Sequence, residues 1–114
     1  MSALFQLQTQ GTCAVISLSG RMVGSDDIAE IMNNADSAIQ SGSFNVICDC
    51  SSLEYCNSTG LNFFVRLLTK SRSKGGDCVL VNLQPAVEKL FTLSKLNEIF
   101  TSYDSVDNAL TSFN

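Results

Sequence analysis

The sequence predicts an α/β fold in which helices pack on a mixed β-sheet. Residues 3–9 and 13–19 alternate apolar and polar side chains around a turn that contains Gly11, which is typical of a β-hairpin. Beyond this hairpin, segments with apolar residues at helical spacing alternate with short apolar segments. These observations predict the order β-β-α-β-α-β-α-β-α, with about four to five strands and about four helices.

The first helix is expected over about residues 28–40. Ser25 is expected to cap it, and Asp26 and Asp27 follow the cap, where acidic side chains are favoured by the positive end of the helix dipole. Its apolar stripe consists of Ile28, Ile31, Met32, Ala35 and Ile39. This stripe predicts one helix face against the sheet.

The third strand is expected over residues 44–50, which are rich in buried and β-branched residue types. Residues 51–56 are expected to form a loop. A second helix is expected from residues 57–60 to about Ser73. Its predicted core-facing stripe is Leu61, Phe64, Val65 and Leu68.

The C-terminal part of the chain continues the alternation. Residues 77–82 form a short, almost wholly apolar strand, as expected in a sheet that is covered on both faces. Pro85 begins a third helix, because its missing N–H costs nothing at a first helical position. The inner face of this helix is expected to contain Val87, Leu90, Phe91 and Ser94. Residues 99–103 predict a short edge strand, and residues 105–113 a last helix with Val106, Ala109, Leu110 and Phe113 inward.

Length and charge restrict the class of protein. The 114 residues predict one domain over 1–114, and the alternative is that the chain is a domain of a longer protein. The net charge of −4 argues against binding to nucleic acid and to an anionic membrane surface, both of which attract basic proteins. No apolar run is long enough to cross a bilayer, and the first residues lack the pattern of a secretory signal, so we expect a cytoplasmic location.

The chain has few combinations of side chains of the types that act as catalytic bases, nucleophiles or metal ligands. The chain has no histidine, which excludes Ser-His-Asp and Cys-His hydrolytic arrangements. Its five cysteines are odd in number and scattered, so they are expected to be free, buried thiols that hold no metal. The alternative, a small thiol-redox or nucleotide-hydrolysing enzyme, would need a CxxC pair or a glycine-rich phosphate loop, and the sequence has neither. We therefore expect a protein that is not an enzyme and needs no cofactor.

Two blocks of sequence resemble a known family. The first runs through residues 48–56 (CDCSSLEYC) into residues 57–61 (NSTGL), where a strand leads into a helix. The second consists of residues 85–91 (PAVEKLF), followed by 93–96 (LSKL) and 99–100 (IF). With these blocks in order, the chain resembles the anti-sigma-factor antagonist family, the STAS domain, over essentially its whole length. The resemblance implies a single STAS domain.

Three positions depart from the family pattern. Asn57 stands where an aspartate is usual, although it can still cap the helix. The residues that follow Gly20 offer no acid before Asp26, whereas the family often has one shortly after this glycine. Lys95 stands where a glycine is common, which predicts a strained turn at that point.

The resemblance also implies a function. Ser58 is expected to be phosphorylated by a serine kinase that acts as an anti-sigma factor, with Thr59 as the second choice. The unphosphorylated form would bind that kinase and free a sigma factor, and a protein phosphatase would restore it. The expected partner-binding residues are Asp26, Asn57, Ser58, Thr59, Gly60 and Phe63.

Several alternatives remain open for these residues. Residues 57–59 could be only a helix cap and first turn, and Phe63 could be the edge of a wide core face. The domain could also be an interaction module that is not phosphorylated, like the STAS subunit of a lipid-transport ATPase or a part of a stressosome-like scaffold.

Physical chemistry is consistent with a switch at Ser58. A hydroxyl at a helix N-terminus lies beside unpaired backbone N–H groups, which can hold phosphate oxygens. Phosphorylation adds nearly two negative charges. A charge of this size at that position is expected to block a partner without unfolding the domain.

Overall fold

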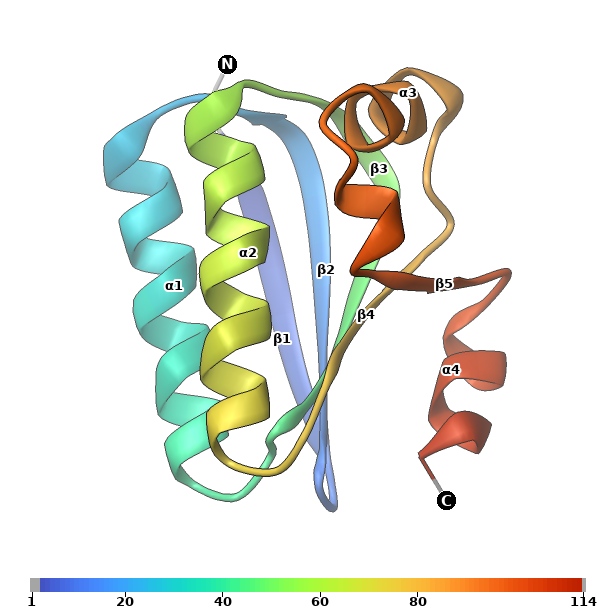
Figure 1. Ribbon diagram of the computed structural model, residues 1–114. Helices are drawn as coiled ribbons and strands as arrows, with labels where there is room; N and C mark the ends of the chain where they lie inside the picture. Colours follow the sequence, from blue (N-terminus) through green and yellow to red (C-terminus); the bar gives the residue numbers. More distant parts are fainter. Residues whose placement is uncertain (1–2, 114) are drawn as a thin grey trace.

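In the computed structural model, which describes residues 3–113, five strands form one sheet in the order β1-β2-β3-β4-β5 (Figure 1). β1 and β2 form the predicted antiparallel hairpin, and β2 to β5 are parallel to one another. The strands are β1 (Leu4–Gln10), β2 (Cys13–Met22), β3 (Asn45–Cys56), β4 (Cys78–Val81) and β5 (Thr101–Tyr103). The helices are α1 (Ser25–Gln40), α2 (Ser58–Ser73), α3 (Pro85–Leu93) and α4 (Val106–Ser112), with a 3-10 turn η1 (Leu96–Glu98). The predicted fold class and order of elements are confirmed.

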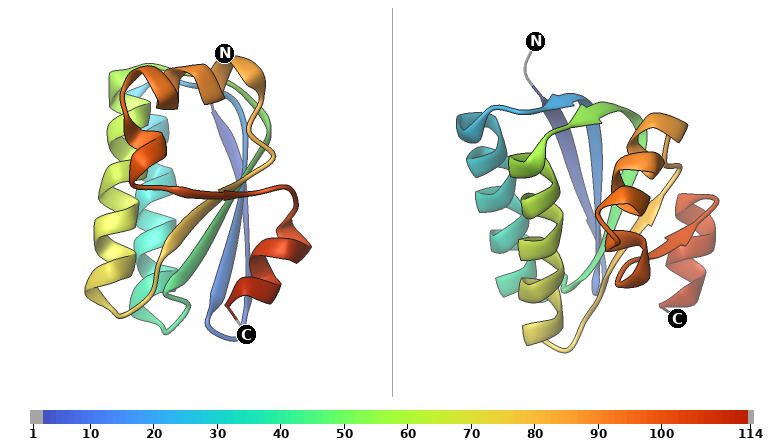
Figure 2. Two further views of the ribbon diagram at one scale, coloured as in Figure 1. Left: turned by 45° about the vertical axis from the view of Figure 1, so that its right-hand side comes forward. Right: turned by 45° about the horizontal axis from the view of Figure 1, so that its top comes forward.

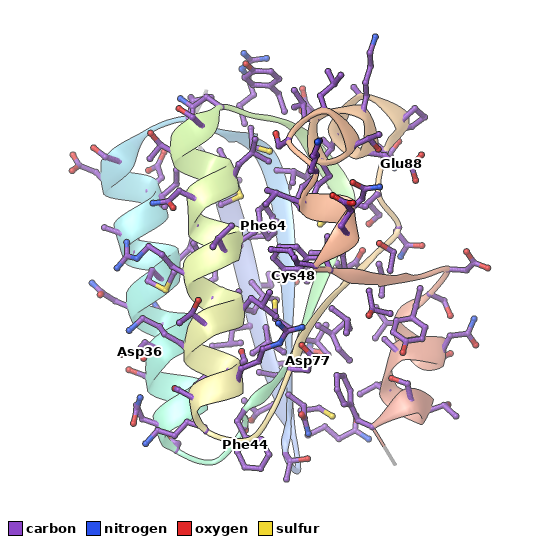
Figure 3. The ribbon with its side chains drawn as sticks, in the orientation of Figure 1. Asp36, Phe44, Cys48, Phe64, Asp77 and Glu88 are labelled. Carbon is purple, nitrogen blue, oxygen red and sulfur yellow. The ribbon has the colours of Figure 1, made fainter. Side chains whose placement is uncertain are left out.

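Helices cover both faces of the sheet, unequally. α1, α2 and α3 lie over one face and α4 lies against the other (Figure 2). Phe64 points from α2 toward the sheet, into the layer that also holds Cys48 (Figure 3). Four rings, those of Phe63, Phe64, Phe91 and Phe100, make successive edge-to-face contacts at 5.2, 5.3 and 5.8 Å between centroids. This row of rings joins α2 to α3 and to the residue before β5.

The segment 51–56 is strand, so the prediction of a loop is wrong. β2 also continues beyond residue 19 to Met22, and the two strands stay paired up to Met22 and Cys56. The pairing includes register shifts between Ser17 and Ser19 and between Gly20 and Arg21, where β3 carries additional residues. Such bulges break the alternation of buried and exposed side chains, which explains why the sequence pattern did not predict a strand.

Three details of the helices also differ from the predictions. Gly24, and not Ser25, is the N-cap of α1, and it makes no side-chain hydrogen bond. The buried face of α2 is centred on Phe63, Phe64, Leu67, Leu68 and Ser71, whereas the predicted Leu61 and Val65 are only half-buried. α2 packs against α1 as well as the sheet, so its buried face is rotated and wider than a single apolar stripe predicts. Ser94, which was expected to face inward, is exposed and donates its hydroxyl to Leu90 O.

Other local expectations agree with the structure. Pro85 is the first residue of α3, as predicted. The last helix, α4, begins at Val106, and Ser105, for which no cap was predicted, caps it by accepting from Asn108 N. Lys95 has a φ of 62°, in the left-handed region that favours glycine. Within residues 3–113, no helix is both long enough and apolar enough to cross a membrane.

Candidate functional site

The ends of β2 and β3 bring the starts of α1 and α2 to the same edge of the sheet (Figures 1 and 2). Met22 and Cys56 are the last paired residues of these two strands. Directly after them, the backbone N–H of Asn57 donates to Met22 O at 3.3 Å. The carboxyl ends of neighbouring parallel strands are where binding sites gather in α/β folds, so this edge is the first place to look for one.

Asn57 is the N-cap of α2 and also contacts the neighbouring connection. Its Oδ1 accepts a hydrogen bond from Gly60 N at 3.1 Å, which satisfies one of the free amides of the first turn. Its Nδ2 donates to Val23 O at 3.3 Å, in the connection between β2 and α1. One side chain therefore links two segments that are 34 positions apart.

Ser58 is the first residue of α2, and both Ser58 and Thr59 are exposed. Among the hydrogen bonds of residues 3–113, none uses either hydroxyl. Asn57 pairs with the amides of Gly60 and Leu61, which leaves the amides of Ser58 and Thr59 free at the start of the helix. The first turn of α2 contains no acidic residue. The surroundings of the Ser58 hydroxyl therefore suit an anion.

Gly60, one of the expected partner contacts, is buried in the structure and leaves little surface for a partner. A Cβ at this position would lie 2.5 Å from Met22 O and 2.7 Å from the Cβ of Cys56. The missing side chain lets the first turn of α2 lie directly on the ends of β2 and β3. Gly60 therefore sets the position of the first turn of α2, which carries Ser58.

Phe63 is also a core residue, and the expectation that it contacts a partner is wrong. Its side chain is 1% exposed and packs edge-to-face on Phe64. Leu67, one turn further along, is fully buried. The alternative interpretation, that Phe63 belongs to a wide core face, is correct.

The two acids of α1 have different environments. Asp26 is exposed in the first turn of α1, at the same sheet edge as Ser58. Asp27 accepts a hydrogen bond from Ala3 N at 3.3 Å. Asp26 is therefore the acid of this pair that a partner could contact at the site.

Two features of this edge were not predicted from the sequence. Val23 is 36% exposed, although it is apolar, and it lies next to the Asn57 side chain. Arg21 stacks on the ring of Tyr55, with 4.7 Å between the guanidinium carbon and the ring centroid. Arg21 and Tyr55 are register partners, and the extended β2–β3 pairing that places them together could not be read from the sequence.

Burial favours the neutral form of several core thiols. All five cysteines are free and buried. Contact with the Cys78 thiol at 3.9 Å, together with burial, raises the pKa of Cys48 well above its usual value, and burial raises the pKa of Cys50 likewise. Burial raises the pKa of Cys56 to about 11. A thiolate nucleophile is therefore disfavoured at these positions.

Three hollows of the described surface are lined by residues other than Ser58. Adjoining hollows of about 200 and 280 Å³ lie between α3 and β5, with Glu88 in the wall of both. An open hollow lies between Ser51–Glu54 of β3 and the start of α3. None of these three is lined by residues 57–60, and within residues 3–113 no cluster of acids, thiols or imidazoles could hold a metal ion. The exposed Ser58 edge lines none of these three hollows, whereas small molecules usually bind in enclosed pockets.

Comparison with known proteins agrees with this architecture. The family model of the STAS domain matches residues 5–109. The anti-sigma factor antagonist SpoIIAA in its unphosphorylated form superposes with a TM-score of 0.84 at 22% identity, over 96% of each chain. Phosphorylated SpoIIAA of Bacillus superposes with a TM-score of 0.78 at 21% identity, over 97% of this chain and 100% of the other. An anti-sigma factor antagonist from Mycobacterium paratuberculosis gives 0.82 at 22%, over 97% and 93%. At these identities the superpositions show the fold.

Proposed function

The chain belongs to the STAS domain family, and we propose that it is an anti-sigma factor antagonist whose switch is the hydroxyl of Ser58. In this proposal, the unphosphorylated protein binds an anti-sigma factor that is itself a serine kinase. Binding releases a sigma factor, phosphorylation of Ser58 ends the binding, and a protein phosphatase restores it. The protein acts in the cytoplasm as one non-enzymatic domain, without cofactor or metal.

The observation that carries the proposal is the position of Ser58. It is exposed, it begins α2, and the amides of Ser58 and Thr59 are free. A kinase can reach an exposed hydroxyl at a helix start. The free amides and the helix dipole can then hold the phosphate that results.

Electrostatics explain how one phosphate ends binding without unfolding the domain. Phosphorylation adds about 1.5 to 2 negative charges at Ser58. At the N-terminus of α2 this charge is favourable, and the first turn contains no acid to oppose it. A partner pressed against the same surface would have to strip water from the phosphate, which costs several kcal/mol unless the partner supplies its own cations.

The surface that would meet the partner differs from the one expected from the sequence. It keeps Asp26, Asn57, Ser58 and Thr59, all of which lie at one edge of the sheet. It excludes Gly60 and Phe63, which are buried.

The experiment that tests this function measures binding to the serine-kinase anti-sigma factors encoded in the same genome, without ATP. The wild type and Ser58→Ala should bind one of them, and Ser58→Asp should bind at least about tenfold more weakly, which corresponds to about 1.4 kcal/mol. Ser37→Asp introduces the same charge at an exposed position in the second half of α1 and should bind like the wild type. Equal binding by Ser58→Asp and the wild type would contradict the switch and favour an interaction module that is not phosphorylated.

A further inference from the structure

We propose that Val23 and Ser58 form one continuous contact surface, and that the side-chain amide of Asn57 is the positioning group that holds them together. The inference rests on the proposed function, because it describes the surface that the partner meets. It adds an apolar contact point, Val23, and assigns the amide of Asn57 a task that an acid in its place could not perform.

The evidence is a set of three hydrogen bonds made by Asn57. Its backbone N–H donates to Met22 O at 3.3 Å, its Nδ2 donates to Val23 O at 3.3 Å, and its Oδ1 accepts from Gly60 N at 3.1 Å. The first bond runs to the last residue of β2, the second to the connection between β2 and α1, and the third into the first turn of α2. Asn57 therefore joins the two segments on either side of the site.

Only an amide can make both side-chain bonds at once. Serine, threonine and aspartate, like asparagine, accept hydrogen bonds from the backbone amides of a first helical turn, so any of them can cap α2. An ionised aspartate has no hydrogen to donate, and its second oxygen would repel Val23 O. The hydroxyl of serine is too short to replace both ends of the amide. Asparagine combines the cap of α2 with a hydrogen bond from its Nδ2 to Val23 O, which we call the tie.

The tie matters because, among residues 3–113, no other side-chain hydrogen bond reaches Val23 or Gly24. Val23 and Gly24 separate β2 from α1, and Gly24 caps α1 without any side-chain hydrogen bond. Val23 is 36% exposed, one of the few large apolar side chains at the surface of the described residues. The bond from Asn57 holds the Val23 carbonyl against the residue that precedes Ser58, and so restricts where the exposed side chain of Val23 can lie relative to the start of α2.

The chemistry of this surface defines the partner segment that fits it. An apolar side chain of the partner would pack on Val23, and an uncharged hydroxyl at Ser58 would lie at the rim of that contact. A phosphate on Ser58 would then stand next to a desolvated apolar contact, where an uncompensated charge is most costly. This arrangement makes the binding sensitive to phosphorylation.

Two variants separate the tie from the cap. Asn57→Ser and Asn57→Asp both keep an acceptor for Gly60 N. Aspartate has no hydrogen to donate to Val23 O, and the single, shorter hydroxyl of serine cannot replace both ends of the amide at once. Order parameters of backbone amides, measured by ¹⁵N relaxation without any partner, should fall at Val23 and Gly24 from the rigid range of about 0.85 toward about 0.6 in both variants. The amide of Gly60 should stay rigid in both. Unchanged order at Val23 and Gly24 would overturn the tie.

Binding to the kinase tests the contact surface. Val23→Ala and Asn57→Ser should each weaken binding of the unphosphorylated protein, by about tenfold, and the double variant should be little weaker than either single variant, because both act through one contact. Leu93→Ala removes an apolar side chain that is 71% exposed on α3, and it should leave binding unchanged. Binding of Val23→Ala as strong as that of the wild type would contradict the proposal that Val23 contacts the partner. If the wild type binds no such kinase, the proposed function is contradicted instead. The relaxation experiment then still tests whether the bond from Asn57 to Val23 O holds the connection.

Discussion

A side chain at Gly60 has no room beside Met22: an added Cβ would lie 2.5 Å from the Met22 carbonyl oxygen. The same oxygen accepts the hydrogen bond from Asn57 N. The end of β2 and the start of α2 are therefore in direct backbone contact, and Ser58 stands at the surface of this contact. Two substitutions test the packing on which the site depends.

Gly60→Ala should destabilise the protein. The new Cβ would also lie 2.7 Å from the Cβ of Cys56, so the start of α2 must move. We expect a loss of about 1–3 kcal/mol in the free energy of unfolding, since overpacking outweighs the gain of up to about 1 kcal/mol from helix propensity. Urea denaturation measures it. Gly24→Ala is the matched control, because its Cβ would meet nothing closer than 3.4 Å. If Gly60→Ala is as stable as the wild type, the contact with Met22 is looser than described.

Phe63→Ala should show that this ring belongs to the core. The side chain is 1% exposed and packs on Phe64, so its removal leaves a cavity. We expect a loss of about 3–5 kcal/mol in the free energy of unfolding. Leu93→Ala, at a side chain 71% exposed, should change stability by less than about 0.5 kcal/mol. A small effect at Phe63 would restore it as a surface residue.

Alkaline pH should weaken the fold through its buried thiols. Burial raises the pKa of Cys56 to about 11, whereas the unfolded chain exposes this thiol with an ordinary pKa of about 8.5. Between these two values the thiol ionises only in the unfolded state, so stability is complete below about pH 8.5 and declines as the pH rises toward 11. Cys48 and Cys50, whose pKa values are also raised, add to the same decline.

Urea midpoints at a series of pH values across this window measure the effect. Cys56→Ala should reduce the slope of midpoint against pH, whatever its effect on stability at neutral pH. A slope identical to that of the wild type would show that Cys56 ionises in the folded protein as easily as in the unfolded one.

The order of elements was predictable because its signals are local. Alternation around Gly11 defined the hairpin, and apolar residues at helical spacing defined α1 and α3. The position of Ser58 at the start of α2 followed from the same signals together with a cap at Asn57. Lys95 was predicted to be strained from its place in the family pattern, and its φ of 62° agrees.

The errors concern features that depend on contacts between distant segments. Residues 51–56 form strand because β2 pairs with them through register shifts, which leave no regular alternation in the sequence. Phe63 is buried because α2 packs against α1 as well as the sheet, so a single helical stripe does not describe the buried face of α2. The bond from Asn57 to Val23 joins residues far apart in the chain, and no pattern within either segment indicates it.

The measurement that tests the central claim most directly is to map the phosphate that a serine-kinase anti-sigma factor of the same genome adds with ATP. Mass spectrometry of the digested protein should find one phosphate, on Ser58, and Ser58→Ala should acquire none. Thr59 is also exposed and lies one residue further along the same turn, so it is the strictest control that the chain offers. Phosphate on Thr59, or on neither residue with every such kinase, would contradict the account.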